Sequence, residues 1–268
     1  MPNKYEYLLD LLEPYVITYG VSDLNLTSSM LHSPIKDELK VEPLNYLSTP
    51  FVEKIYKLDE LAFGSKGMGM PRWVLVDCAA MPGFIVGFAI KASSLSSSDK
   101  ALFGEKFFHD TDYFPLSMYI AIPTKERGVW FGHNLSSLNG KMELNLSGLG
   151  FLTKLVALDL FNIKTLRGAT QWNSQAVFIH HKFSALRLLS ALTPIHSHEL
   201  SFVYESKLTK SSSELLSNSL LKDNFEKANI FEPNYINCRE LQKRIESKKN
   251  VYIEGVTKIN DKMLYNLN

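Results

Sequence analysis

The chain has 268 residues, 45% of them hydrophobic, which is enough for one large domain or two modest domains with a sizeable core. Its 29 lysines and arginines nearly balance 28 aspartates and glutamates, so no global field favours a nucleic-acid partner. Cys78 and Cys238 stand far apart in the sequence, which argues against a disulfide scaffold or a structural zinc site. No apolar run reaches the ~18 residues that span a bilayer, and the first residues lack a signal-peptide pattern, so we expect a soluble cytoplasmic protein.

The N-terminal part, residues 1–50, is expected to be an extension that packs on the core rather than folding alone. Residues 4–17 carry apolar side chains at helical spacing, interrupted near Pro14. Residues 20–50 are polar, and prolines break any long element within them.

Residues 51–205 are expected to form one domain of alternating helices and strands. Helical periodicity marks residues 51–63 and 174–183, and Asn173 is a suitable N-cap for the second helix. The segments with strand character are 72–79, 84–91, 116–123, 128–135, 163–172, 186–193 and 200–205. We expect the first two strands to pair as a hairpin.

The C-terminal part, residues 206–268, is expected to be an appendage. It begins with a Ser- and Lys-rich, weakly apolar stretch and continues with a mixed helical pattern. Such a composition is typical of a loosely attached segment, so its removal should leave a folded core.

The segment from Lys141 to Leu160 organises the middle of the chain. It begins as a short alternating run, passes through Gly148-Leu149-Gly150 and continues with helical apolar spacing, which predicts strand, turn and helix. A glycine turn at a helix start leaves backbone N–H groups unpaired, and these groups and the helix dipole suit a phosphate. A tight turn without any ligand has the same pattern, so both interpretations stay open.

Two blocks of sequence resemble one known family. Asn145-Leu146-Ser147-Gly148-Leu149-Gly150 is similar to the (Gln/Arg)-x-x-Gly-x-(Gly/Ala) signature of the GNAT N-acyltransferases, with Asn145 where glutamine or arginine is usual. Residues 173–184 resemble the family pattern Asn-x-x-Ala-x-x-x-Tyr-x-Lys-x-Gly, with His180 at the tyrosine and Ser184 at the glycine. The resemblance covers residues 51–205.

The resemblance implies a fold and a co-substrate. The fold is α/β, a GNAT-like mixed and mainly antiparallel sheet with helices on both faces, plus the two terminal extensions. The co-substrate is acetyl-CoA or another acyl-CoA, whose pyrophosphate the glycine loop holds. The residues expected to bind it are Asn145, Ser147, Gly148, Leu149, Gly150, Phe151 and Asn173.

A second stretch competes for the phosphate loop. Arg127 to Gly132 follows an Ile-Pro pair and resembles the lead-in to the family signature. No amphipathic helical pattern follows Gly132, so we place a strand or hairpin at 128–135 and the loop at 145–150.

The resemblance also implies direct attack of an amine on the thioester, without an enzyme nucleophile. His180 is then the proton donor to the departing sulfur, and Tyr204 is a reserve donor. Glu143, just before the loop, is expected to take the amine proton through water. His133 competes for that role if the strand lies at 128–135.

Other polar clusters give weaker predictions. His196-Ser197-His198, with His180 or Glu199, offers imidazoles for a metal, but no paired cysteine or helical His-x-x-x-His supports zinc, so no metal is expected. These histidines suit a polar acceptor pocket better. Asp110-Thr111-Asp112 imitates a sugar-nucleotide motif and is too short to count.

We therefore expect a CoA-dependent N-acyltransferase, in the simplest case an acetyltransferase, that acts on a small-molecule amine, with no nucleic-acid or membrane partner. The alternative is a catalytically decayed GNAT-like module that binds a ligand or partner, because Asn145 and Ser184 depart from the family pattern. The sequence leaves monomer and homodimer both open.

Overall fold

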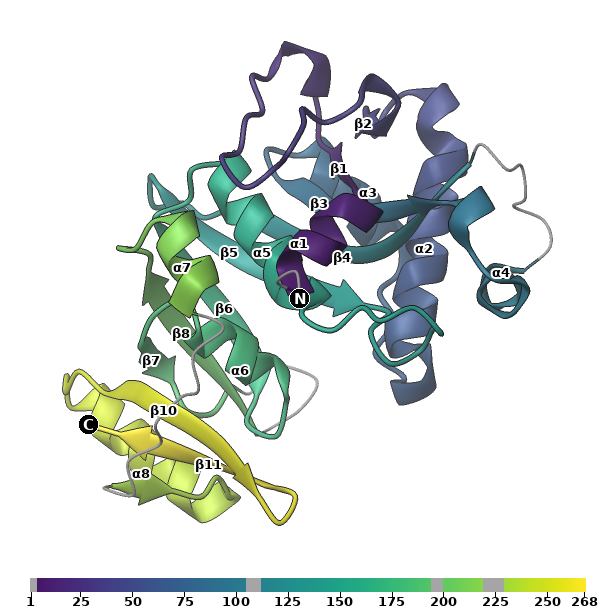
Figure 1. Ribbon diagram of the computed structural model, residues 1–268. Coiled ribbons are helices and arrows are strands. Elements are labelled where there is room, and N and C mark those ends of the chain that lie inside the picture. Colours follow the sequence, from purple (N-terminus) through teal and green to yellow (C-terminus); the bar gives the residue numbers. More distant parts are fainter. Residues whose placement is uncertain (1–3, 105–111, 194–199, 219–228) are drawn as a thin grey trace. The chain divides into compact units, whose positions relative to one another are not determined.

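The computed structural model of the protein describes residues 4–104, 112–193, 200–218 and 229–268 (Figure 1). The chain divides into two compact units, one formed by Met1–Pro123 and His133–Asn162, the other by Thr124–Gly132 and Ile163–Asn268. The predicted borders at residues 50 and 205 do not coincide with this division.

The first unit contains helices and strands that precede residue 163. Its helices are α1 (Lys4–Leu11), α2 (Thr49–Phe63), α3 (Arg72–Ala80), α4 (Ser97–Phe103) and α5 (Leu149–Leu160), and its strands are β1 (Glu13–Ile17), β2 (Lys40–Val41), β3 (Phe84–Lys91) and β4 (Tyr113–Pro123). Short 3₁₀ helices lie at Val21–Asp23, Asp37–Leu39, Tyr46–Ser48, Gly64–Lys66 and Ala92–Ser94. Strand β3 pairs antiparallel with both β1 and β4, while β1 pairs parallel with β2.

Helix α5 is the inner helix of this unit. Every one of its residues except Asp159 is buried, and the helix packs on β3 and β4. A helix that is apolar nearly all round must be enclosed, which is the environment that its sequence predicts.

The second unit is built mainly from the chain after residue 162. Strand β5 (Val129–Ser137) begins in it, and its other elements are β6 (Thr165–Gln171), α6 (Ala176–His181), β7 (Leu186–Ser190), β8 (Ser201–Lys207), α7 (Ser212–Asn218), β9 (Ile230–Phe231), α8 (Tyr235–Glu246), β10 (Tyr252–Ile259) and β11 (Lys262–Leu267). The strand order is β5-β6-β8-β7-β10-β11-β9. Only the β5–β6 pair is parallel among the pairings that the structure gives for this unit.

Most predicted elements are confirmed within a few residues. The two long predicted helices correspond to α2 and α6, and the strands at 84–91, 116–123, 128–135, 163–172, 186–193 and 200–205 correspond to β3, β4, β5, β6, β7 and β8. The prediction of a mixed, mainly antiparallel α/β fold is confirmed as well.

The strand predicted at 72–79 is wrong, because these residues form α3. Leu75, Cys78 and Ala79 are buried at helical spacing, and Trp73 is exposed. A short apolar run cannot be assigned to helix or strand by its own pattern, and here tertiary packing selects the helix. Strand β3 therefore has no hairpin partner before it and pairs with β1 and β4 instead.

Three smaller predictions are also wrong. The helix predicted over 4–17 ends at Leu11, and the residues around Pro14 form β1, since proline cannot continue a helix. Residues 141–148 form turns and bends instead of a strand. Asn173 does not cap α6, whose N-cap is Gln175.

The C-terminal segment is integrated into the second unit. Strand β10 pairs with β7, and the tail supplies these buried side chains to the core: Cys238, Leu241, Val251, Ile253, Val256, Met263, Tyr265 and Leu267. Trp172 belongs to the same cluster. Its indole N–H donates to the carbonyl of Ala191 at 2.9 Å, and its own carbonyl accepts from Tyr265 Oη. The tail thus supplies about half of the buried side chains of this cluster.

Candidate functional site

The predicted phosphate loop leads directly into α5. Gly148 is the N-cap and has φ +91°, a left-handed conformation that glycine adopts without strain. Asn145 accepts a hydrogen bond from the Ser147 N–H at 3.2 Å, and the Leu149 N–H donates to the Leu146 carbonyl at 3.0 Å. These bonds fix the turn that begins the helix.

The N-terminal helix α1 lies against this turn. A Cβ added at Gly148 would lie 3.0 Å from Tyr5 Cε1 and 3.3 Å from Lys4 Cε, with Lys4 Nζ at 3.6 Å. The turn therefore has no room for a side chain at Gly148. It also combines the positive end of the α5 dipole with the ammonium group of Lys4, two features that attract an anion.

The competing stretch from Arg127 to Gly132 does not lead into a helix. Gly128 has φ +78° in a turn, and β5 starts at the next residue. Of the two loops that the sequence suggests, only the one at 145–150 stands at a helix start.

The two predicted proton donors lie together in the second unit. His180 on α6 is 8% exposed, and its ring centroid is 5.3 Å from that of Tyr204 on β8. Gly168 on β6 makes room for Tyr204, because a Cβ there would lie 2.6 Å from the phenol oxygen. Burial raises the pKa of Tyr204 far above its usual range, so its hydroxyl keeps its proton near neutral pH.

The predicted proton acceptors have contrasting surroundings in the first unit. Glu143 is exposed, and hydrogen bonds from Ser98 and Ser96 lower the pKa of its carboxyl, which makes it a weak base. His133 is on β5, the condition under which it competes for this role. Its side chain is exposed, but packed neighbours remove part of its hydration, and this desolvation lowers its pKa. The negative charge of Asp59 acts in the opposite direction and is the smaller effect, so the neutral base is favoured.

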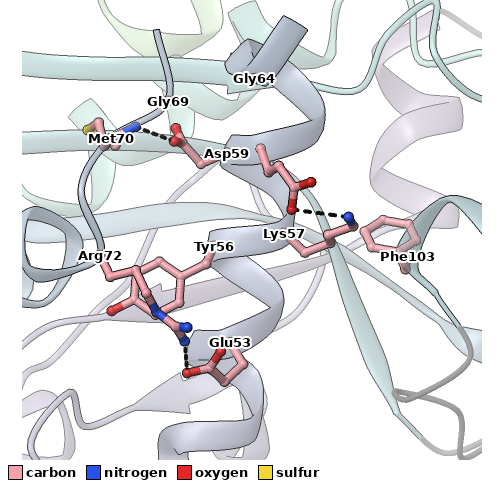
Figure 2. Close-up of a pocket in the computed structure, with 10 residues that line it drawn as sticks. Glu53, Tyr56, Lys57, Asp59, Gly64, Gly69, Met70, Arg72 and Phe103 are labelled. Carbon is pink, nitrogen blue, oxygen red and sulfur yellow. Dashed lines mark hydrogen bonds and ion pairs between the residues drawn. The ribbon is translucent and has the colours of Figure 1, made fainter. Parts of the chain in front are cut away.

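Asp59 is a residue that the sequence did not single out. It lies on α2, is 3% exposed and lines a pocket of about 550 Å³ bordered by α2, the glycine loop, α3 and α4 (Figure 2). The available signal was a carboxylate next to Leu58 and four residues after Ile55, on the buried face of the helix.

Among the described residues, no group of three or more His, Cys, Asp or Glu side chains is arranged to hold a metal ion. His196, His198, Glu199, Asp110 and Thr111 lie outside the described residues. No helix among the described residues is long and apolar enough to cross a membrane.

Comparison with known proteins gives similarities in structure alone. No family model matches the sequence, and no curated protein matches it. The ribosomal-protein-S18-alanine N-acetyltransferase of Escherichia coli is similar with a TM-score of 0.38 and 9% identity, over 64% of this chain and 95% of that one. Diaminobutyrate acetyltransferase from Paenibacillus lautus, solved with its substrate and coenzyme A, gives a TM-score of 0.38 and 6% identity, over 59% and 89%.

A protein from Desulfovibrio desulfuricans assigned to the GNAT acetyltransferases has a TM-score of 0.38 and 12% identity, over 63% of this chain and 98% of that one. Each of these structures is similar to about three fifths of this chain, at 12% identity or less.

Proposed function

We propose that the chain is an acyl-CoA-dependent N-acyltransferase, in the simplest case an acetyltransferase of a small-molecule amine. The observation that carries the proposal is the start of α5, where Gly148 in the left-handed conformation, the helix dipole and Lys4 meet. A diphosphate group is the part of acyl-CoA that such a site would hold.

Acyl transfer from a thioester to an amine requires that the enzyme position the two reactants and assist two proton transfers. The amine nitrogen must lose its proton before it attacks the thioester carbon, and we propose His133 as the acceptor of that proton rather than Glu143. The lowered pKa of His133 keeps its imidazole neutral and able to accept a proton, whereas the lowered pKa of Glu143 makes its carboxylate a still weaker base. The departing sulfur takes a proton, for which we propose His180, with Tyr204 in reserve. The rings of His180 and Tyr204 are both buried and contact each other.

The test uses two glycines that differ in one respect. Gly148 and Gly140 both have positive φ, but a side chain at Gly140 would meet nothing within 4 Å. Replacing either with alanine has a similar backbone cost of about 1 kcal/mol, and only Gly148→Ala crowds the loop. Ligand at a hundred-fold excess over its Kd should add about 2.7 kcal/mol of stability.

We expect CoA to raise the Tm of the full chain and of Gly140→Ala, and to leave Gly148→Ala unchanged. A shift that persists in Gly148→Ala would move the phosphate site to another loop, with Arg127 to Gly132 next in line. No shift in the unmodified chain would refute the proposal. If CoA binds but no amine in a broad panel consumes acetyl-CoA, the non-catalytic binding module is favoured.

A further inference from the structure

The pocket beside α2 contains five charged side chains, and four of them pair with each other. Glu60 accepts from Lys57 at 3.1 Å, and Glu53 pairs with Arg72, whose guanidinium also lies 4.4 Å from the centroid of the Tyr56 ring (Figure 2). The two members of each pair neutralise each other, so the remaining charge in the lining is that of Asp59.

Asp59 is held only by neutral donors. Its Oδ2 accepts from the Met70 N–H at 2.7 Å and its Oδ1 accepts from Asn134 Nδ2 at 3.3 Å. Among the described side chains, no lysine or arginine pairs with it. Burial raises the pKa of this carboxyl, and the hydrogen bonds from the Met70 N–H and from Asn134 only partly oppose the rise. A buried carboxylate without a cation is costly, and a ligand cation at the pocket wall would relieve that cost.

Gly69 lies beside Asp59 in the lining of the pocket. A Cβ added there would lie 3.7 Å from Asp59 Oδ2, an ordinary van der Waals contact, so an alanine methyl would take up space next to this oxygen. The φ of Gly69 is not in the left-handed region, so alanine fits the backbone at this site. Glycine therefore leaves this space next to the carboxylate free of a side chain of its own.

We infer that Asp59 holds the positively charged amino group of the acceptor, and that Gly69 leaves it the room to do so. A primary ammonium has three N–H donors, and each oxygen of Asp59 has accepting capacity beyond its one bond. The Tyr56 and Phe103 rings and the Met70 side chain line the same pocket and can cover the alkyl part. Naming this compound the acceptor rests on the proposed function, whereas the ammonium site rests on the pocket alone.

The experiment compares n-butylammonium with 1-butanol, which has a similar chain and no charge, by NMR titration of the full-length protein at neutral pH. The variants are Asp59→Asn, which keeps the size and removes the charge, and Gly69→Ala, which keeps the charge and blocks the approach. Asp23→Asn, an exposed aspartate outside the pocket, is the matched control.

We expect n-butylammonium to bind the unmodified chain and Asp23→Asn alike, and Asp59→Asn and Gly69→Ala at least tenfold more weakly, with 1-butanol weak throughout. Equal ammonium affinity in the folded Asp59→Asn and unmodified proteins would overturn the inference. If Asp59→Asn does not fold, Gly69→Ala decides, because unchanged affinity there would equally overturn it.

A CoA titration of the same samples separates this inference from the proposed function. Ammonium binding that depends on Asp59, without any CoA binding, supports the cation site and refutes the acyltransferase. CoA binding with ammonium affinity independent of Asp59 refutes the cation site and leaves the acyltransferase standing.

Discussion

Lys154 is an ionisable residue that is fully buried in the first unit. It is on α5, has 0% exposure, and its ammonium nitrogen is 5.9 Å from the centroid of the Tyr119 ring. Burial disfavours the charged form and lowers the pKa from 10.5 to about 7. The residue is therefore a source of pH-dependent stability within the inner helix.

Replacing Lys154 with methionine should raise the free energy of unfolding at neutral pH, since it removes a charge that is costly to bury. One pKa unit corresponds to about 1.4 kcal/mol, so a gain on the order of a few kcal/mol is expected. Between pH 7 and pH 10.5 the unfolded lysine binds more protons than the folded one, so the stability of the unmodified chain rises with pH there. The advantage of the methionine variant should thus be largest at and below pH 7 and vanish near pH 10.5.

Urea denaturation at several pH values measures this difference. Lys141→Met, which changes an exposed lysine, should show no comparable gain at any pH. A Lys154→Met variant that is less stable than the unmodified chain at pH 7 would show that the lysine contributes more as a charge than its burial costs.

His180 on α6 is the proposed proton donor to the leaving sulfur. If it donates the proton to the leaving sulfur, His180→Ala should lower kcat by about 100- to 10,000-fold with little change in CoA affinity. His180→Tyr should restore part of the rate, because tyrosine returns an acid to the same position of α6. The steady-state rate and the CoA thermal shift are measured together.

His181→Ala, at the next position of the same helix, is the control and should retain its rate. Because His180 is buried against Tyr204, the unfolding curve of each variant must also be compared. Normal turnover in a folded His180→Ala variant would exclude His180 as the donor and make Tyr204 the next candidate.

At the scale of elements, the sheet of the first unit depends on a glycine in its middle strand. Tyr15 of β1 passes over Gly87 of β3 and donates its hydroxyl proton to the carbonyl of Ser117 on β4 at 2.8 Å. A Cβ at Gly87 would overlap both Tyr15 and that carbonyl. Glycine in this strand therefore serves close packing and not a turn.

Gly87→Ala should destabilise the first unit by about 3 kcal/mol or more, because it overpacks the core and displaces a buried hydrogen bond. Gly69→Ala, whose Cβ has an ordinary contact distance, should remain within about 0.5 kcal/mol of the unmodified chain. Chemical denaturation of both variants provides the comparison, and equal stabilities would contradict the packing at Gly87.

At the scale of the whole molecule, the chain after residue 206 completes a core that begins much earlier. The tail and the segment around Trp172 share one cluster of buried side chains, and the Tyr265 ring meets Trp172 edge-on at 4.8 Å. The core of the second unit therefore requires both the elements near residue 170 and those near residue 265.

A chain that ends at Lys207 should lose the cooperative fold of its second unit, because Trp172 and its neighbours would be left exposed. Circular dichroism and thermal unfolding of the shortened chain test this expectation. A soluble product that unfolds cooperatively with an unchanged Trp172 environment would instead support the removable appendage that the sequence suggests.

Two point variants on α8 sharpen the test without truncation. Leu241 is buried and Ile236 is 72% exposed on the same helix. Leu241→Ala should cost about 2–5 kcal/mol, whereas Ile236→Ala should cost no more than about 0.5 kcal/mol.

The sequence by itself determined the elements whose signals are local. The glycines at 148 and 150 and the apolar spacing after them predicted the start of α5, and alternating or β-branched runs predicted β3 to β8. The site residues predicted from the two family-like blocks stay predictions, although His180 and Tyr204 do lie in contact.

Only the tertiary structure decided what depends on residues distant in sequence. The segment at 72–80 is a helix in which Leu75, Cys78 and Ala79 are buried at helical spacing. The tail forms part of a core because its side chains share one buried cluster with Trp172. Asp59 became a candidate only when the fold placed Gly69, Met70 and Asn134 around it. Local patterns fix which backbone shape a segment prefers, but burial and pairing arise from contacts between segments, which no local pattern contains.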